Sequence, residues 1–187
     1  MNPFLEKLYQ SGLDHDAAEP DRRRRLRNLE PVTAELLATV VRIAKARDIV
    51  EIGTSNGWSA LWLAEAARDT GGRVTTVDVA EWPGAAENLA GAGVERVVAD
   101  GGDYLARQND GEIDLLFLDA ERTEYASWWP HPARVLRPGG VLAVDNVLSH
   151  PGEVADLLAL AQERFIGGTA AVGKGLYLGW LKPQSHR

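Results

Sequence analysis

The sequence contains no cysteine. Disulfides, thiolate zinc sites and a cysteine nucleophile are therefore excluded, and any metal ion must be held by oxygen or imidazole ligands. A net basic charge is also absent, because 27 acidic residues outnumber 20 basic ones and give a formal charge of −7. This balance argues against general binding to nucleic acid or to an anionic membrane surface, so we expect neither as a partner.

Long apolar runs are missing as well. No run approaches the length of a membrane span, and the N-terminus MNPFLEKLYQSG lacks the basic-then-apolar pattern of a signal peptide. We therefore expect a cytoplasmic protein. With 187 residues, of which 45% are hydrophobic, the chain suits one domain with a single sizeable core.

Short apolar runs alternate with helix-patterned segments from about residue 49 onward. This alternation predicts an α/β fold, a doubly wound parallel sheet with helices on both faces. The expected strands are 48–53, 72–79, 95–100, 113–120 and 139–146, and the expected helices are about 31–46, 57–68, 83–91, 102–109, 125–136 and 151–165. The helix at 125–136 should start late or kink because it contains two prolines, and the final GTAAVGKGLYLGWL predicts an antiparallel hairpin.

Residues 1–30 differ from the rest of the chain. They suggest two short helices separated by a polar loop, which could cover the sheet edge as a lid or mediate a dimer, whereas 31–187 form the main domain. The RRRR run at 22–25 favours a solvated helix face or acidic partners across a dimer. An anionic tail on a substrate is a second interpretation of this run.

A glycine loop follows the first expected strand, in VEIGTSNGWSALWLA (50–64). Gly53 and Gly57 allow a tight turn and close approach of a ligand, and the start of the next helix favours an anion such as an amino-acid carboxylate. Glu51 could bind the matching ammonium. The spacing is not G-x-G-x-x-G, so a dinucleotide is disfavoured. Asp78 and Asp100, at two further strand ends, could bind ribose hydroxyls and an adenine amino group, although such acids may also only cap helices.

The same loop together with TTVDV, FLDAERTEY and LRPGGVLAVDN resembles the class I S-adenosylmethionine-dependent methyltransferases. Within that class, the sequence is most similar to the metal-dependent O-methyltransferases related to catechol and caffeoyl-CoA O-methyltransferase, over roughly residues 31–181. The resemblance implies a Rossmann-like, seven-stranded sheet whose last strand is antiparallel, and homodimers are common in the family. The resemblance and the positions of the residues together suggest which residues bind S-adenosylmethionine. The candidates are Glu51, Gly53, Ser55, Gly57, Ser59, Asp78, Trp82, Asp100 and Asp119.

Three oxygen-bearing side chains end the fourth and fifth expected strands: Asp119, Asp145 and Asn146. Because these strands are neighbours in the fold, two carboxylates would meet at one edge and repel each other unless a cation lay between them. The set suits Mg²⁺, with Ca²⁺ or Mn²⁺ as alternatives. Asp145 and Asn146 could instead simply begin a turn.

The base that this family uses is missing. The resemblance implies a lysine three residues after Asp119, but that position is Arg122, which stays protonated and cannot act as a general base. Arg122 could still stabilise a phenolate. His150 could serve as the base or be an exposed bystander, and Trp128 or Trp129 could line the substrate pocket.

The leading hypothesis is an S-adenosylmethionine-dependent O-methyltransferase that acts on a small, catechol-like hydroxylated acceptor. The catalytic candidates are Asp119, Arg122 and His150, and a divalent cation would assist. A metal-independent methyltransferase of another small molecule and a non-catalytic S-adenosylmethionine-binding protein remain open. An NAD(P)-linked oxidoreductase is a further alternative, which the glycine spacing disfavours.

Overall fold

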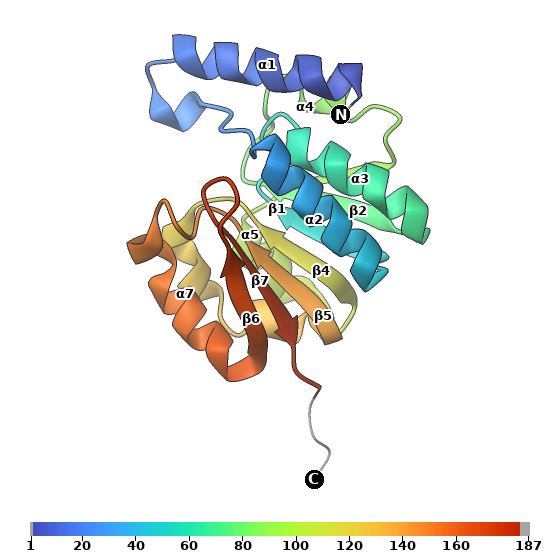
Figure 1. Cartoon of the computed structure of the whole chain (residues 1–187), viewed down its shortest axis with the longest axis vertical. Helices are drawn as coiled ribbons and strands as arrows, with labels where there is room; N and C mark the ends of the chain where they lie inside the picture. Colours follow the sequence, from blue (N-terminus) through green and yellow to red (C-terminus); the bar gives the residue numbers. More distant parts are fainter. Residues whose placement is uncertain (1, 184–187) are drawn as a thin grey trace.

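Seven strands form a single sheet in the order β3-β2-β1-β4-β5-β7-β6 in the computed structural model, which describes residues 2–183 (Figure 1). The strands are β1 (Asp48–Ile52), β2 (Arg73–Asp78), β3 (Val94–Val98), β4 (Ile113–Leu118), β5 (Leu136–Val144), β6 (Phe165–Ala170) and β7 (Leu176–Leu181). Strands β1 to β5 pair in parallel, and β7 is antiparallel to both of its neighbours. The expected doubly wound sheet with an antiparallel C-terminal strand is therefore confirmed.

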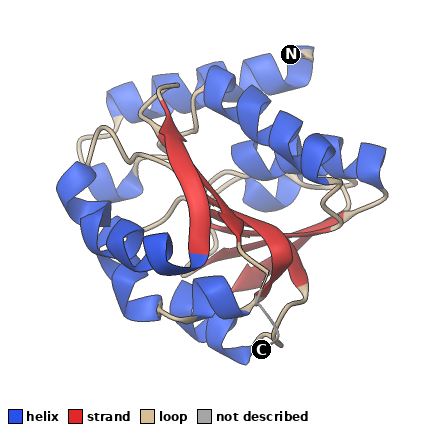
Figure 2. Cartoon of the chain, turned by 60° about the horizontal axis from the view of Figure 1, so that its bottom comes forward, coloured by secondary structure: helices blue, strands red, loops and turns tan. Residues whose placement is uncertain are grey.

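Helices cover both faces of the sheet, as the blue ribbons on either side of the red strands show (Figure 2). They are α1 (Pro3–Ala18), α2 (Pro31–Ala44), α3 (Trp58–Thr70), α4 (Ala85–Asn88), α5 (Gly101–Arg107), α6 (His131–Arg134) and α7 (Pro151–Arg164), with 3₁₀ segments η1 (Arg22–Arg24) and η2 (Arg122–Trp128). No helix within residues 2–183 is long and apolar enough to cross a membrane.

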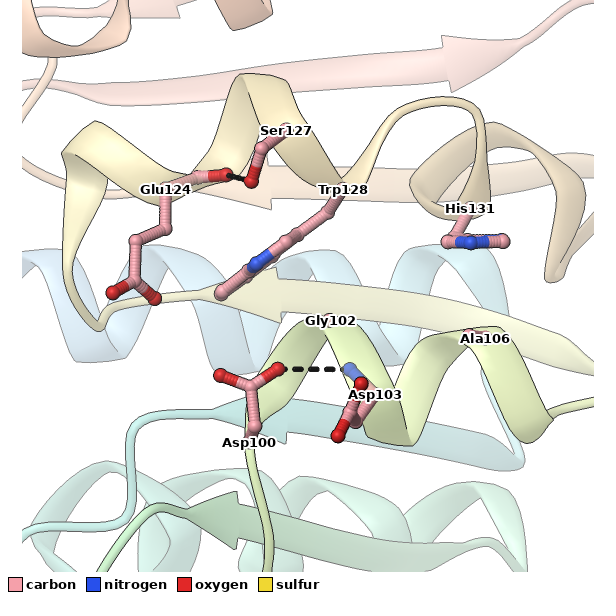
Figure 3. Close-up of a pocket in the computed structure, with 8 residues that line it drawn as sticks. All are labelled: Asp100, Gly102, Asp103, Ala106, Glu124, Ser127, Trp128 and His131. Carbon is pink, nitrogen blue, oxygen red and sulfur yellow. Dashed lines mark hydrogen bonds between the residues drawn. The ribbon is translucent and has the colours of Figure 1, made fainter.

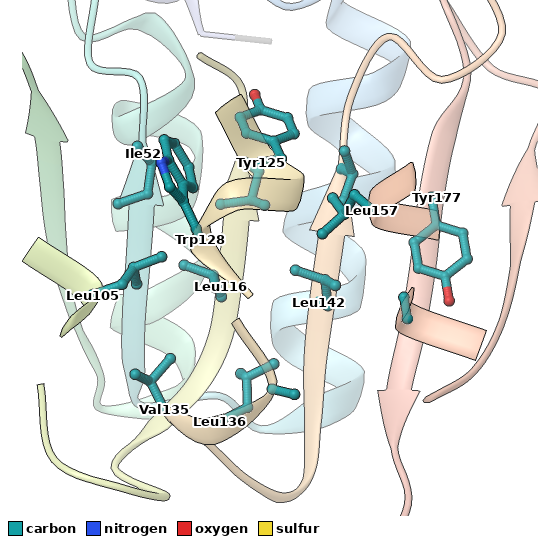
Figure 4. Packing of buried hydrophobic residues seen from close by; sticks show 14 of the residues in the cluster. Ile52, Leu105, Leu116, Tyr125, Trp128, Val135, Leu136, Leu142, Leu157 and Tyr177 are labelled. Carbon is teal, nitrogen blue, oxygen red and sulfur yellow. The ribbon is translucent and has the colours of Figure 1, made fainter. Parts of the chain in front are cut away.

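The central strands are buried on both sides, as parallel strands of this fold class must be. On β4, Leu116 and Leu118 pack into one core with η2 and α7, whereas Leu115 and Phe117 pack into the other with α2 and α3. Figure 4 shows the first core, in which Leu116 lies among side chains from the helices and neighbouring strands. The two cores together hold the strand ends in fixed register.

Three segments differ from the sequence-based expectations. Residues 2–30 form one 16-residue helix and a single 3₁₀ turn, and the absence of a side chain at Gly12 lets Asn28 pack against this helix. The helix expected at 83–91 is reduced to the single turn of α4, and that at 125–136 splits into η2 and α6 around Pro130.

The chain reverses its direction across the sheet between β1 and β4. From β1 it moves outward through β2 and β3, and it then returns to β4 on the opposite side of β1. In open α/β sheets, ligands bind outside the carboxyl ends of the strands at this point. A ligand-binding site is therefore expected at the carboxyl ends of β1 and β4.

Candidate active site

The glycine loop connects the end of β1 to α3. Gly53 has φ +115° and Gly57 has φ +86°, both in the region that favours glycine. A Cβ on Gly53 would overlap the carbonyl oxygen of Asp119, so only glycine lets the ends of β1 and β4 approach this closely. The loop thus brings its backbone N–H groups to the mouth of the sheet beside Asp119.

Asp78, at the end of β2, is hydrogen-bonded to the backbone of this loop. Its Oδ2 accepts hydrogen bonds from the backbone N–H groups of Thr54 (2.9 Å) and Ser55 (3.1 Å). Its Oδ1 accepts only a long bond of 3.4 Å from the Ala80 N–H. The carboxylate therefore shapes the loop with one oxygen and can offer the other to a ribose hydroxyl, as the sequence suggested.

Glu51 is a fully buried acid one residue before the end of β1. Its Oε2 accepts a 2.6 Å hydrogen bond from the Thr76 hydroxyl, whereas its Oε1 is buried without a hydrogen-bond partner. Burial raises the pKa of Glu51 to about 7, although the hydroxyls of Ser59 and Thr76 oppose the shift. A cationic group beside Oε1 would satisfy this carboxylate, so the site fits the ammonium of an amino-acid ligand.

Asp119, Asp145 and Asn146 meet as the sequence predicted. Leu118 and Val144 are paired in the β4–β5 ladder, which places the aspartates that follow them side by side. The Asn146 side-chain amide donates to Asp145 Oδ2 at 2.7 Å and to Asp119 Oδ1 at 3.2 Å.

The charge of this cluster is poorly compensated. Burial is the largest cause that raises the pKa of Asp119 to about 7 and that of Asp145 to about 8. Repulsion by Glu51 adds to the shift of Asp119, and repulsion by Asp119 adds to that of Asp145. Asp145 Oδ1 is buried without a hydrogen-bond partner. Rotation of the Asn146 amide would turn its carbonyl oxygen toward the aspartates and give a three-oxygen set suited to a hard cation. Within residues 2–183, however, no group of three or more His, Asp or Glu side chains is arranged to hold a metal ion.

The two other catalytic candidates lie at the side of this cluster. Arg122 is the first residue of η2, and its Nε donates to Glu153 Oε2 on α7 at 2.7 Å. His150 precedes α7, and its Nδ1 lies 2.9 Å from the Ser149 hydroxyl. The structure thus ties both side chains to the α7 side of the site.

Asp100 and Trp128 border a cavity of about 460 Å³ between α5 and η2 (Figure 3). Asp100 caps α5 by accepting a 2.9 Å hydrogen bond from the Asp103 N–H. The Trp128 ring lies so close to Gly102 that a Cβ there would overlap it. Trp128 therefore packs on the start of α5, beside the residue that we expected near an adenine.

The remaining cofactor candidates lie near the glycine loop. Ser59 is buried in the first turn of α3, and the Ser55 hydroxyl donates to the carbonyl oxygen of Leu26 at 2.8 Å. Trp82, after β2, is half-buried, and its indole nitrogen is buried without a hydrogen-bond partner.

A strap from the N-terminal segment, residues 26–29, crosses the glycine loop. Besides the Ser55 bond, the buried indole of Trp58 donates to the carbonyl oxygen of Leu29 at 2.9 Å.

The sequence had also not indicated Lys174, whose ammonium pairs with Glu30 at 3.0 Å. Lys174 lies between two glycines in a hairpin turn, a pattern that predicts the turn but gives no sign of a site.

Comparison with known proteins agrees with this geometry. A family model described as "Methyltransferase domain" matches residues 50–147. A catechol O-methyltransferase from Mycobacterium tuberculosis is 35% identical over 130 residues, which cover 65% of this chain and 58% of that protein. The chain thus spans less than two thirds of the length of this curated relative.

Solved structures resemble the whole chain. An O-methyltransferase from Streptomyces achromogenes involved in tomaymycin synthesis, solved in complex with SAM, is 27% identical, with a TM-score of 0.75, and the match covers 98% of this chain and 91% of that one. An O-methyltransferase from Bacillus cereus in complex with SAH has the same fold, with 23% identity, a TM-score of 0.79 and coverage of 97% and 92%. The resemblance seen in the sequence is confirmed, and the chain belongs to the methyltransferase-domain family.

Proposed function

We propose that this protein is an S-adenosylmethionine-dependent O-methyltransferase that acts on a small, aromatic, catechol-like acceptor with the help of a divalent cation, Mg²⁺ before Ca²⁺ or Mn²⁺. One observation carries the proposal: the Asp119–Asp145–Asn146 cluster lies beside the glycine loop at the point where the sheet reverses direction. The unpartnered oxygens of Glu51 and Asp145 support it, because each fits a cationic ligand group.

The residues that would hold S-adenosylmethionine surround the end of β1. Glu51 Oε1 would accept from the ammonium, the glycine loop would approach the carboxylate with its N–H groups, and Asp78 Oδ1 would accept from the ribose. When bound, this cofactor supplies an electrophilic methyl group, and a divalent cation supplies a Lewis acid and a template for two vicinal hydroxyls.

The chain itself would orient the acceptor and protect the reaction. Asp119 and Asp145 would hold the cation and thereby direct a hydroxyl oxygen toward the methyl group. The strap at residues 26–29 covers the glycine loop through the Ser55 and Trp58 hydrogen bonds, so it would exclude water from the bound cofactor.

Methyl transfer to catechol, with and without EDTA, tests the function. We expect transfer that stops on chelation and returns on addition of Mg²⁺. Calorimetry should show binding of S-adenosylmethionine and none of NAD⁺, and the reverse result would overturn the cofactor assignment. Binding without transfer to any hydroxylated acceptor would indicate a non-catalytic S-adenosylmethionine-binding protein.

Metal-independent transfer is a second candidate, because the Asn146 amide already bridges both aspartates and a lysine ammonium lies nearby. It predicts a rate that EDTA leaves unchanged.

A further inference from the structure

The turn between β6 and β7 is hydrogen-bonded to the loop that follows Asp145 and Asn146. The backbone N–H groups of Leu148 and Ser149 donate to the carbonyl oxygen of Lys174 at 3.0 and 3.1 Å. Gly175 has φ +93°, and a Cβ there would overlap the Leu148 side chain. The position of Lys174 is therefore coupled to the loop that carries the cation cluster.

The other side of the turn packs on the N-terminus of α2. A Cβ on Gly173 would lie 2.6 Å from Glu30 Oε2 and would also overlap the Thr33 hydroxyl. Glu30 precedes the first residue of α2, so its backbone position is set by that helix. Two glycines thus let the turn fit between α2 and the end of β5.

Glu30 holds the Lys174 ammonium at this place. Its Oε1 lies 3.0 Å from Nζ, and the two side chains are 24% and 43% exposed. Partial burial opposes the charged form, but the Glu30 carboxylate raises the pKa of Lys174, so the group remains an ammonium. Glu30 occupies one of its three N–H donors, which leaves two for a ligand.

The charges around the ammonium come from several elements. Glu30 before α2, Asp145 after β5 and Asp119 after β4 all act on it. Burial raises the pKa of both aspartates, and the Lys174 charge counteracts this shift. The Lys174 backbone is hydrogen-bonded to Leu148 and Ser149, two and three residues beyond Asn146, so the ammonium belongs to the same end of the sheet as the cluster.

Arg122 pairs with a residue of α7. It occupies the position where the family resemblance implies the catalytic lysine, but its Nε is bound to Glu153 on α7. Its guanidinium side chain is only 13% exposed. Lys174 is thus a second cationic group at the cluster, from a different strand connection, and it lowers the pKa of both aspartates, whereas Arg122 lowers only that of Asp119.

We propose that Lys174 is a catalytic residue whose ammonium donates a hydrogen bond to the acceptor oxygen that is methylated, and that Glu30 is the positioning residue that holds it. This proposal rests on the O-methyl transfer proposed above and adds the group that stabilises the anionic form of the acceptor. A cation within hydrogen-bond distance lowers the pKa of a hydroxyl by about 1–3 units. Lys174 would therefore increase the reactive fraction near neutral pH.

The step balances without a further reactant. The acceptor hydroxyl releases its proton to solvent, its oxygen forms the new bond to the methyl carbon, and the electron pair of the broken carbon–sulfur bond stays on sulfur. Lys174 keeps its proton throughout, so it needs no base of its own.

The probe is 4-nitrocatechol, whose ionisation is visible by absorbance. Lys174→Met should raise the pKa of 4-nitrocatechol bound to the protein with S-adenosylhomocysteine by about 1–2 units. It should lower the rate of methyl transfer to catechol, whose hydroxyls are largely protonated at neutral pH, by about 10- to 100-fold at that pH, and the rate should recover at high pH as the hydroxyl ionises unaided. Lys174→Arg should show smaller changes in the pKa of the probe and in the rate, because it keeps the charge. Glu30→Gln should change both quantities in the same direction as Lys174→Met, but less.

The matched control is Lys182→Met, at the far end of β7, where the ammonium binds the carbonyl oxygens of Gln162 and Glu163. Calorimetry with S-adenosylmethionine and thermal unfolding establish that each variant is folded. If the wild-type protein methylates catechol and Lys174→Met matches it in rate and in the ionisation of bound 4-nitrocatechol, the role of Lys174 is overturned. The role is also overturned if the rate of Lys174→Met falls equally at every pH, since that indicates a structural effect. A wild-type protein that binds S-adenosylmethionine but methylates no hydroxylated acceptor would overturn the proposed function itself, and this role with it.

Discussion

Gly53, at the end of β1, lies in backbone contact with Asp119, at the end of β4: a Cβ on Gly53 would overlap the carbonyl oxygen of Asp119. This contact joins the two halves of the site, since Gly53 begins the glycine loop and Asp119 belongs to the cluster that we propose as the cation site. The φ of +115° at Gly53 adds a second restriction on any larger residue.

Gly53→Ala should therefore both destabilise the protein and weaken cofactor binding. The strained backbone costs about 1–3 kcal/mol, and the added methyl group must push β1 and β4 apart at the site. We expect a lower free energy of unfolding in urea and an affinity for S-adenosylmethionine reduced by at least about 10-fold, the equivalent of 1.4 kcal/mol.

Gly71→Ala is the matched control, because Gly71 also has a positive φ, of +67°, but has no atom within 4 Å of an added Cβ. It should cost about 1–2 kcal/mol through the backbone alone and leave cofactor affinity unchanged. Equal losses of affinity in the two variants would show that the Gly53–Asp119 contact has no special role.

Asp145→Asn should remove cation dependence together with activity. The substitution keeps the shape of the buried Asp145 side chain but deletes one of two adjacent carboxylates. We expect methyl transfer to fall by about 100-fold and Mg²⁺ binding, measured by calorimetry, to be lost. Asp156→Asn, on the exposed side of α7, makes the same chemical change away from the site and should alter neither. Full activity in Asp145→Asn would remove the cation from the mechanism.

The free protein should become less stable as pH rises from about 4 to about 8. The pKa values of Asp119 and Asp145 are raised to about 7 and about 8 from 3.8, so the folded state binds more protons than the unfolded state in this range. The stability that Asp119 and Asp145 contribute is complete below their pKa in the unfolded state. It is lost as the pH rises through their pKa values in the folded state. Thermal unfolding near about pH 6 and about pH 9 should show this decline, and Mg²⁺ should reduce it by pairing with the ionised carboxylates.

A stability that increases over the same range, without Mg²⁺, would show that the aspartates are ionised and compensated in the free protein. Asp145→Asn provides the control, since removal of one carboxylate should flatten the profile.

The fold was predictable because its strands carry strong local signals. Buried runs in β2, β4 and β5 end on acidic residues, so the positions of Asp78, Asp119 and Asp145 at one edge follow from a parallel sheet. The packing of Asn28 against Gly12 of α1 was not predictable, because it joins residues that lie far apart in the chain and no local pattern reports it.

The site was predictable only in part. The meeting of Asp119 with Asp145 and Asn146 depends on one strand pairing, which the fold class supplies. The Lys174–Glu30 pair depends instead on how a hairpin turn packs against the start of α2, and no local pattern in the sequence reports such packing. The attachment of Arg122 to α7 is likewise a tertiary contact, so the sequence showed the departure from the family but not its consequence.

The strap over the glycine loop gives the last prediction, through two tryptophans on one helix. Trp58→Phe should leave the carbonyl oxygen of Leu29 without its 2.9 Å hydrogen bond in a buried position. This costs about 1–3 kcal/mol, and the loosened strap should weaken binding of S-adenosylmethionine.

Trp62→Phe is its control, because the indole nitrogen of Trp62 is buried without a hydrogen-bond partner. Removal of an unsatisfied N–H saves its desolvation penalty, so this variant should lose less stability than Trp58→Phe and keep its cofactor affinity. Urea unfolding and calorimetry on both variants separate loss of an aromatic ring from loss of the strap. If Trp62→Phe weakened cofactor binding as much as Trp58→Phe, the effect would belong to the packing of α3, and the Trp58–Leu29 hydrogen bond would have no part in covering the cofactor.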